Sequence, residues 1–203
     1  MNIVIIKYNS GNVQSVLFAL QRIGINAAVT NNHEEIIAAD KVIIPGVGEA
    51  NSAMNSLKEN NLDSIIKNLK QPVLGICVGM QLLCRYSEEN NTNCLGIFDE
   101  PVKLFSPLSF GEEPDVRLKV PQIGWNAIYN LQSPLMKNIP ENSYCYFVHS
   151  YYVPPNPYSI ATTNYVQPYS SAIHKNNFFG IQFHAEKSAD VGEQILKNFV
   201  ELV

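Results

Sequence analysis

Cys77 lies in the string Gly75-Ile76-Cys77-Val78-Gly79, between a short apolar run and a helix-like pattern. The form G-x-C-x-G is the thiol counterpart of the G-x-S-x-G elbow, in which a tight strand-to-helix turn exposes a nucleophile. The partial positive charge of the following helix N-terminus favours a thiolate there. A buried cysteine beside packing glycines is the commoner origin of an isolated string of this form, so both interpretations stay open.

A cysteine nucleophile needs a base within hydrogen-bond reach and a group that orients this base. His184 and Glu186 follow an apolar strand pattern in the string GIQFHAEKS. Residues i and i+2 of an extended segment point the same way, so the Glu186 carboxylate can hold His184 in one tautomer. The pair is the candidate base for Cys77, although His-x-Glu alone is more often surface chemistry.

Two glycines follow another buried strand pattern, in Pro45-Gly46-Val47-Gly48. They let the backbone turn an N–H toward a ligand, where it can help hold the negative oxygen of a tetrahedral intermediate together with the Val78 N–H. The sequence has no G-x-x-x-x-G-K, and no G-x-G-x-x-G follows the first strand. The string therefore predicts an oxyanion site and not a phosphate site.

The remaining histidines and cysteines have structural interpretations, and the candidate triad does not resemble a metal site. The candidate cysteine, histidine and glutamate lack any familiar zinc-ligand spacing, so no metal is expected. We interpret His149 as a packed, hydrogen-bonded histidine, and His33 and His174 as plain solvent-exposed side chains. The four cysteines form no C-x-x-C pair, and with no export signal we expect reduced thiols and a cytoplasmic location.

The composition predicts one soluble α/β domain over residues 1–203, with 46% hydrophobic residues to form its core. The formal charge of -4 comes from acids and bases mixed along the chain, which argues against nucleic acid or an anionic membrane as the main partner. The apolar start is too short for a signal peptide, and no run approaches the roughly 20 residues of a membrane-spanning helix.

The elements that must position these groups alternate in the first part of the chain. The apolar patterns predict strands at 2–8, 27–30, 41–48 and 72–76, and helices at 10–25, 32–39, 52–61, 62–69 and 79–87. Such alternation predicts a parallel sheet covered on both faces. From about Cys94 we expect hairpins that extend the sheet, with β-rich segments at 96–105, 125–131, 143–153, 159–166 and 178–184. An exposed loop is expected at 105–115 and a final helix at 190–203.

Together these strings resemble the class I glutamine amidotransferases, which carry a Cys-His-Glu triad. In order, YNSGNVQSV, PGVGEA, GICVGMQLL, VPQIGWN, YFVHSYYV and QFHAEKS resemble the glutaminase subunits of imidazole glycerol phosphate synthases over nearly the whole chain. The resemblance implies a flavodoxin-like three-layer α/β sandwich, whose mostly parallel sheet carries extra antiparallel hairpins. It also implies a single amidotransferase domain and no cofactor.

The resemblance assigns a role to each matched residue. Cys77 would attack the side-chain amide of glutamine and form a thioester, His184 would shuttle the proton, and Glu186 would orient His184. The oxyanion hole would be formed by Val47, Gly48 and Val78. The residues that hold glutamine would be Gly46, Gln81, Glu89, Ser150 and Tyr151.

The resemblance also implies a partner. In the family a (βα)8-barrel synthase subunit forms a heterodimer with the glutaminase and receives ammonia through its interior. The barrel makes imidazole glycerol phosphate and aminoimidazole carboxamide ribotide, so the pair combines hydrolase and lyase chemistry in histidine biosynthesis. The candidate partner-facing residues are Asn12, Trp125, Tyr146 and Lys187, with core packing as the alternative for Trp125 and Tyr146.

The sequence departs from the family pattern at two places. Ala185 stands where proline is more frequent, and this change frees the backbone of His184 because a residue before proline is biased to extended conformations. Gln122 and Ile123 stand where histidine and methionine are commoner, near the expected partner face.

Three other functions fit some of these features. A glutaminase of the same type could serve another pathway, such as surface-sugar amidation or a chorismate-using enzyme. A non-catalytic scaffold would need no intact triad, so the presence of Cys77, His184 and Glu186 argues against it. A cysteine hydrolase acting on peptides or γ-glutamyl chains is the last alternative.

Overall fold

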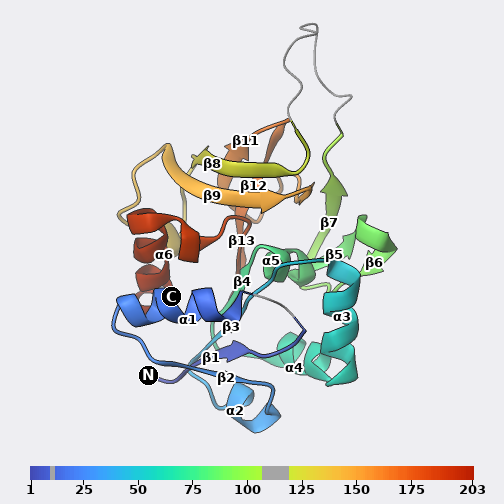
Figure 1. Ribbon diagram of the computed structural model, residues 1–203, viewed down its shortest axis with the longest axis vertical. Coiled ribbons are helices and arrows are strands. Elements are labelled where there is room, and N and C mark those ends of the chain that lie inside the picture. Colours follow the sequence, from blue (N-terminus) through green and yellow to red (C-terminus); the bar gives the residue numbers. More distant parts are fainter. Residues whose placement is uncertain (10–11, 107–118) are drawn as a thin grey trace, which may run out of the picture.

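The structure, a computed structural model, describes residues 1–9, 12–106 and 119–203, and a seven-stranded sheet lies at its centre (Figure 1). The strand order is β11-β12-β13-β4-β3-β1-β2. The strands are β1 (Ile3–Ile6), β2 (Ala27–Thr30), β3 (Lys41–Ile44), β4 (Val73–Ile76), β11 (Ser159–Asn164), β12 (Pro168–Lys175) and β13 (Phe178–Ile181). β13, β4, β3, β1 and β2 are parallel neighbours, whereas β12 and β11 add antiparallel strands at one edge.

Helices cover both faces of this sheet. They are α1 (Val13–Arg22), α2 (His33–Ile37), α3 (Ala50–Glu59), α4 (Leu62–Asn68), α5 (Val78–Leu83) and α6 (Ala189–Glu201). α1 packs with α6, and α3 packs with α4 and α5 on the other face of the sheet (Figure 1). The predicted three-layer α/β sandwich with a mostly parallel sheet is therefore confirmed.

Two smaller sheets lie beyond the central one. β8 (Gln122–Ile128) and β9 (Ser143–His149) form an antiparallel ribbon. A four-stranded sheet has the order β10-β7-β5-β6, with β5 (Cys84–Ser87), β6 (Thr92–Asn93), β7 (Phe98–Leu104) and β10 (Tyr151–Tyr152). Short 3-10 turns occupy η1 (Glu89–Asn91), η3 (Pro134–Met136) and η4 (Ala185–Lys187). Of the β-rich segments expected to extend the central sheet, 159–166 and 178–184 do so as β11 and β13, whereas 96–105, 125–131 and 143–153 contribute strands to the two smaller sheets.

Some local predictions were wrong, each for a tertiary reason. The helix predicted at 79–87 ends at Leu83, because the next four residues pair as β5 with β6 and β7. Strand β12 has no regular alternation in its sequence, and it forms because β11 and β13 pair with it on both sides. His174 is half-buried and stacks on Phe179, with ring centroids 4.0 Å apart, instead of lying free in solvent.

The predicted loop at 105–115 is only partly described. Phe105, its first residue, is fully buried and stacks on Tyr152 with ring centroids 4.6 Å apart, so the loop does not begin as an exposed segment. Residues 107–115 lie outside the described residues.

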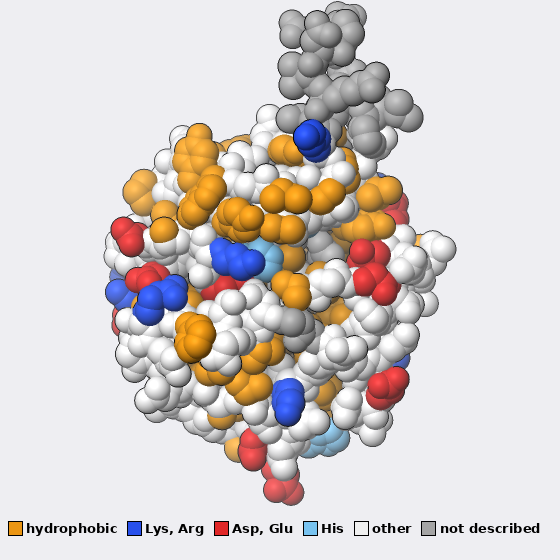
Figure 2. All heavy atoms as spheres, in the orientation of Figure 1, with side chains coloured by type: hydrophobic (Ala, Val, Ile, Leu, Met, Phe, Trp, Pro, Cys, Tyr) orange, Lys and Arg blue, Asp and Glu red, His pale blue; other side chains and the backbone are white. Residues whose placement is uncertain are grey.

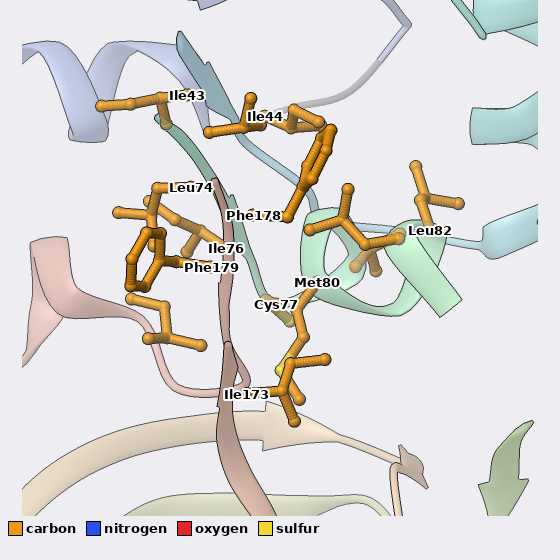
Figure 3. Packing of buried hydrophobic residues seen from close by; sticks show 14 of the residues in the cluster. Ile43, Ile44, Leu74, Ile76, Cys77, Met80, Leu82, Ile173, Phe178 and Phe179 are labelled. Atoms are coloured by element: carbon orange, nitrogen blue, oxygen red, sulfur yellow. The ribbon is translucent and has the colours of Figure 1, made fainter. Parts of the chain in front are cut away.

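Helix α5 lies unusually close to the strands beneath it. A Cβ on Gly75 would lie 2.6 Å from the Gly79 carbonyl oxygen, and one on Gly180 would lie 2.6 Å from Cγ of Met80. A Cβ on Gly79 would overlap the Ile44 carbonyl oxygen. Figure 3 shows Met80 and Cys77 where this helix begins, beside the ends of the core strands. The glycines of the G-x-C-x-G string are therefore needed for close approach of helix to sheet.

We predict that Gly79→Ala destabilises the protein by about 3 kcal/mol, because the new methyl group meets backbone that cannot move aside. Helix propensity alone predicts the opposite sign, a gain of about 1 kcal/mol. Urea unfolding distinguishes the two.

The control is Gly96→Ala, since a Cβ there has nothing within 4 Å and meets only its positive φ of 72°. We expect this variant to lose about 1 kcal/mol. Equal losses for the two variants would contradict the close-approach argument.

Candidate active site

Cys77 occupies a strained turn between β4 and α5. Its backbone has φ 53° and ψ -112°, which is rare for a residue with a Cβ. The Cys77 N–H donates to the Ile181 carbonyl at 2.8 Å and so ties the turn to β13. The Val78 N–H begins α5 and has no acceptor among the described residues. The turn is therefore an elbow that presents a thiol beside a backbone donor.

The parallel pairing of β13 with β4 brings the distant histidine to this elbow. Ile181 is in register with Ile76, so the segments after both strands leave the sheet at the same end. The His184 N–H donates to the Tyr146 carbonyl at 2.9 Å, and its Nδ1 lies 2.6 Å from Glu186 Oε1. His184 and Glu186 are both buried. The structure thus brings the predicted His-Glu pair together beside Cys77.

Alanine stands where the family more often has proline after His184, yet the His184 backbone has the same kind of conformation. His184 has φ -89° and ψ 97°, an extended conformation of the kind that a following proline favours. Ala185 is buried at the start of η4, and its carbonyl packs where a Cβ on Gly192 would lie. Packing against α6 therefore holds this segment without the proline.

Asn12 has a place in the site that the sequence did not suggest. It occupies the N-cap of α1 in a left-handed conformation, and its side chain makes no cap hydrogen bond. Instead the Asn12 Nδ2 group donates to Glu186 Oε1 and lies 3.4 Å from His184 Nδ1. Glu186 Oε2 is buried and has no partner among the described residues. Asn12 and His184 therefore both contact Oε1 of Glu186, the carboxylate oxygen that has hydrogen-bond partners among the described residues.

The charges around His184 favour its protonated form. Burial lowers the pKa of His184, but hydrogen bonds and charges from Cys77 and Glu186 outweigh burial and raise this pKa to about 10. The imidazole is therefore a cation at neutral pH, held between two groups that are negative when ionised.

A cavity of about 300 Å³ opens over the thiol. Most of the predicted oxyanion and substrate residues line it, and the full lining is Val47, Gly48, Cys77, Val78, Gln81, Glu89, Pro121, Val148, His149, Ser150, Tyr151, His184 and Lys187. Pro121, Val148 and His149 were not predicted from the sequence to be site residues. Their strings were noted for resemblance, and only the pairing of β8 with β9 brings them to the cavity.

Gly46 is the predicted substrate contact that does not line the cavity. It is buried below the turn, and a Cβ there would overlap the Gly79 N–H. Gly48 is exposed and has a φ of 97°, a conformation suited to glycine. Gly46 thus lets the turn approach α5, whereas Val47 and Gly48 face the cavity.

Two acceptors in the cavity wall are already engaged by the protein. The Tyr151 carbonyl lies 2.7 Å from His149 Nδ1 and 3.1 Å from Gln81 Nε2, and the Ser150 carbonyl accepts from the Phe105 N–H at 3.0 Å. His149 is packed and hydrogen-bonded as predicted, and burial lowers its pKa to about 4. It is therefore neutral at neutral pH.

Glu89 adds a carboxylate at the rim of the cavity. Its Oε2 accepts from the Ala50 N–H at 2.7 Å, at the first residue of α3. Burial raises the pKa of Glu89, helped by the neighbouring charge of Glu49. The described residues contain no group of three histidine, cysteine or acidic side chains arranged to hold a metal ion.

The predicted partner-facing residues lie beside the cavity mouth. Trp125 is 52% exposed, which excludes core packing, and its ring meets Tyr146 edge-on with centroids 5.9 Å apart. Lys187 Nζ lies 5.9 Å from the centre of the Tyr146 ring. Hydrophobic side chains gather over β8 and β9 on the face shown in Figure 2. Gln122 is buried and accepts from the Tyr169 hydroxyl, so of the two unusual residues only Ile123, 64% exposed, faces outward.

We predict that Glu186→Gln lowers the pKa of His184 from about 10 by about 1–3 units, because the imidazolium loses its buried counter-charge. NMR titration of the His184 ring measures this change. The pair stabilises the folded state fully below pH ~6.5 and loses this effect as pH rises through about 10, so the stability difference between variant and wild type should shrink above pH 10.

Glu193→Gln is the control, since Glu193 forms a surface ion pair with Arg22. An unchanged His184 pKa in Glu186→Gln would show that Glu186 is not its counter-charge.

Known proteins are similar to this chain in sequence and in fold. Residues 4–202 match the family described as glutamine amidotransferase class-I. The HisH subunit of imidazole glycerol phosphate synthase from Bacteroides fragilis is 54% identical over 202 residues, and that from Escherichia coli is 43% identical over 204, each covering 100% of both chains. A putative GMP synthase subunit from Thermoplasma acidophilum has the same fold, with a TM-score of 0.72 and 18% identity over 98% of this chain and 92% of its own.

A second solved structure, of a glutamine amidotransferase, gives a TM-score of 0.73 at 15% identity and covers 98% of this chain and 97% of its own. The match to the family spans nearly every residue, and the HisH relatives align from end to end. The chain therefore belongs to the class-I glutamine amidotransferase family, in its HisH branch.

Proposed function

We propose that this chain is the glutaminase subunit of an imidazole glycerol phosphate synthase and acts in histidine biosynthesis. The observation that carries the proposal is the buried His184–Glu186 pair beside the strained Cys77, within a cavity large enough for an amino acid. The end-to-end similarity to HisH subunits supports the choice of pathway over surface-sugar or chorismate-linked amidation.

In the proposed reaction the Cys77 thiolate attacks the side-chain amide carbon of glutamine. The carbonyl oxygen becomes an oxyanion, which the Val78 N–H and the Val47–Gly48 turn would stabilise. As the C–N bond breaks, the His184 imidazolium gives its proton to the nitrogen. Ammonia leaves, and the γ-glutamyl group stays on Cys77 as a thioester. The protonated state of His184 suits this step.

Water completes the reaction. The now neutral His184 takes a proton from water, whose oxygen attacks the thioester carbon. The C–S bond breaks, glutamate leaves, and the thiolate–imidazolium pair is restored. Glu186 and Asn12 hold the imidazole during both steps through the bonded carboxylate oxygen.

The glutamine would lie between Gln81, Glu89 and the Ser150–Tyr151 segment. The Glu89 carboxylate is a suitable partner for the substrate ammonium group. Because both lone pairs of the Tyr151 carbonyl are engaged, this segment would contact the substrate through its other polar groups.

The ammonia would pass to a (βα)8-barrel synthase subunit in a heterodimer. The exposed aromatic group of Trp125 and Tyr146, with Lys187 at the cavity mouth, is the proposed docking surface. Asn12 would act at its edge, although its amide is committed to Glu186. A docked barrel would shield ammonia from bulk water, where most of it would be protonated. The lyase step belongs to the barrel, while this chain hydrolyses glutamine.

No helix among the described residues is long and apolar enough to cross a membrane. We propose that the chain is a single amidotransferase domain acting in the cytoplasm.

We predict that the barrel subunit with its ribotide ligand increases glutamine hydrolysis, measured as glutamate release, and that Cys77→Ala abolishes it. Substantial hydrolysis by Cys77→Ala would reject Cys77 as the nucleophile. A lack of stimulation by the barrel would reject the pathway while leaving the glutaminase activity intact.

We also predict that Ala185→Pro leaves turnover similar or higher. The His184 backbone is already extended, and among the described bonds the Ala185 N–H donates none. Steady-state kinetics with glutamine measure the effect. A large loss of activity would mean that the segment after His184 differs from the proline-containing form.

A further inference from the structure

A line of two buried amides joins the cavity wall to the thiol. The Gln81 Nε2 group contacts both the Tyr151 carbonyl at 3.1 Å and Gln182 Oε1 at 3.0 Å. The Gln182 Nε2 group then lies 3.7 Å from Cys77 Sγ. We propose that Gln182 is a positioning residue for Cys77. The Tyr151 carbonyl orients the side-chain amide of Gln81, and Gln81 in turn orients the side-chain amide of Gln182 so that its N–H donor faces the sulfur.

Gln182 is held firmly enough for this role. It is fully buried directly after β13, and its backbone N–H donates to the Ser171 carbonyl at 2.9 Å. The register of Ile181 with Ile76 places it beside Cys77, the residue that follows β4. The strand pairing that brings His184 to Cys77 therefore also brings the Gln182 side-chain amide to the sulfur.

The direction of both amides follows from a single backbone group. The Tyr151 carbonyl can only accept, so the Gln81 atom that faces it must be the NH2 group. The second N–H of this group then requires an acceptor, so Gln182 must turn its oxygen toward Gln81. The remaining end of the Gln182 amide, facing Cys77, is therefore NH2 and cannot be the oxygen.

This donor opposes a second contact of the sulfur. Cys77 Sγ lies 3.8 Å from the Val148 carbonyl, which accepts only from the neutral S–H and so favours the thiol. An N–H donor interacts more strongly with a thiolate than with a thiol, so Gln182 favours the ionised nucleophile. Gln182 also fixes the direction of the sulfur below the cavity.

The arrangement sharpens the role of Gln81. Both of its N–H groups are engaged, so only its amide oxygen remains to meet a ligand. This role of Gln81 rests on the proposed function: Gln81 accepts a hydrogen bond from glutamine through its amide oxygen. At the same time its NH2 group orients the Gln182 amide, so that the N–H groups of Gln182 face Cys77.

The test uses Gln182→Met, which removes the donor at similar length, and Gln182→Glu, which still accepts from Gln81 but turns a carboxylate oxygen to the sulfur. The readout is the pH dependence of Cys77 alkylation by iodoacetamide, followed at that site by mass spectrometry. We expect the alkylation rate at pH 7 to fall roughly tenfold in Gln182→Met and further in Gln182→Glu, with the midpoint moved to higher pH. For glutamine hydrolysis, kcat should fall while KM changes little.

Asn198→Leu is the matched control. Asn198 is another buried amide that donates to two carbonyls, of Leu135 and Lys137, away from the cavity. Its loss should lower stability without changing the alkylation profile. If the Gln182 variants do not fold, NMR of the wild-type Gln182 side-chain amide decides, because its resonance should shift as Cys77 is titrated.

An alkylation profile unchanged in folded Gln182→Glu, or an amide resonance that ignores Cys77 titration, would overturn the proposal. These readouts do not need glutamine turnover. A shifted profile in a protein that fails to hydrolyse glutamine would therefore reject the proposed function and leave the role of Gln182 standing.

Discussion

The parallel pairing of β4 with β13 is the contact on which the candidate site depends. It places two strand ends, separated by about a hundred residues in sequence, at the same edge of the sheet. Cys77 follows one strand, and Gln182, His184 and Glu186 follow the other. Ligand sites of open α/β sheets commonly lie at the carboxyl ends of such strands. Among the described residues, Gln182 and His184 reach the thiol through this register, whereas the contact with the Val148 carbonyl comes from β9.

The chemistry also depends on how close α5 can come to the sheet. Cys77 adopts a strained backbone, and the strain is held by packing of glycine backbones beneath and beside the helix. Because the helix begins directly at the thiol, its first N–H is left to face the cavity. The same close approach thus places the Cys77 thiol and the Val78 N–H side by side in the wall of the cavity.

The buried charges are arranged as a shared network. Glu186 uses one oxygen for both His184 and Asn12, which come from opposite ends of the chain. On the other side of the thiol, the Tyr151 carbonyl fixes His149 and Gln81 together. Such networks hold one geometry because any single reversal would leave a buried donor or acceptor unpaired. The Tyr151 segment, the Cys77 thiol and the His184 imidazole are therefore held in one arrangement around the cavity.

The sequence by itself determined the alternating core elements, the G-x-C-x-G elbow, the His-x-Glu pair and the family likeness. The elements and the two motifs depend on the spacing of residues close together in the chain, and the family likeness depends on several motifs that follow in a known order. It did not determine β5 and β12, which form through pairing with strands distant in sequence, nor the burial of Phe105 and Gln122. The roles of Asn12 and Gln182 were also absent from it, since neither amide has a local pattern that marks it. Only the tertiary structure decides which distant donor meets which acceptor, because buried polar groups are satisfied by neighbours in space and not by neighbours in the chain.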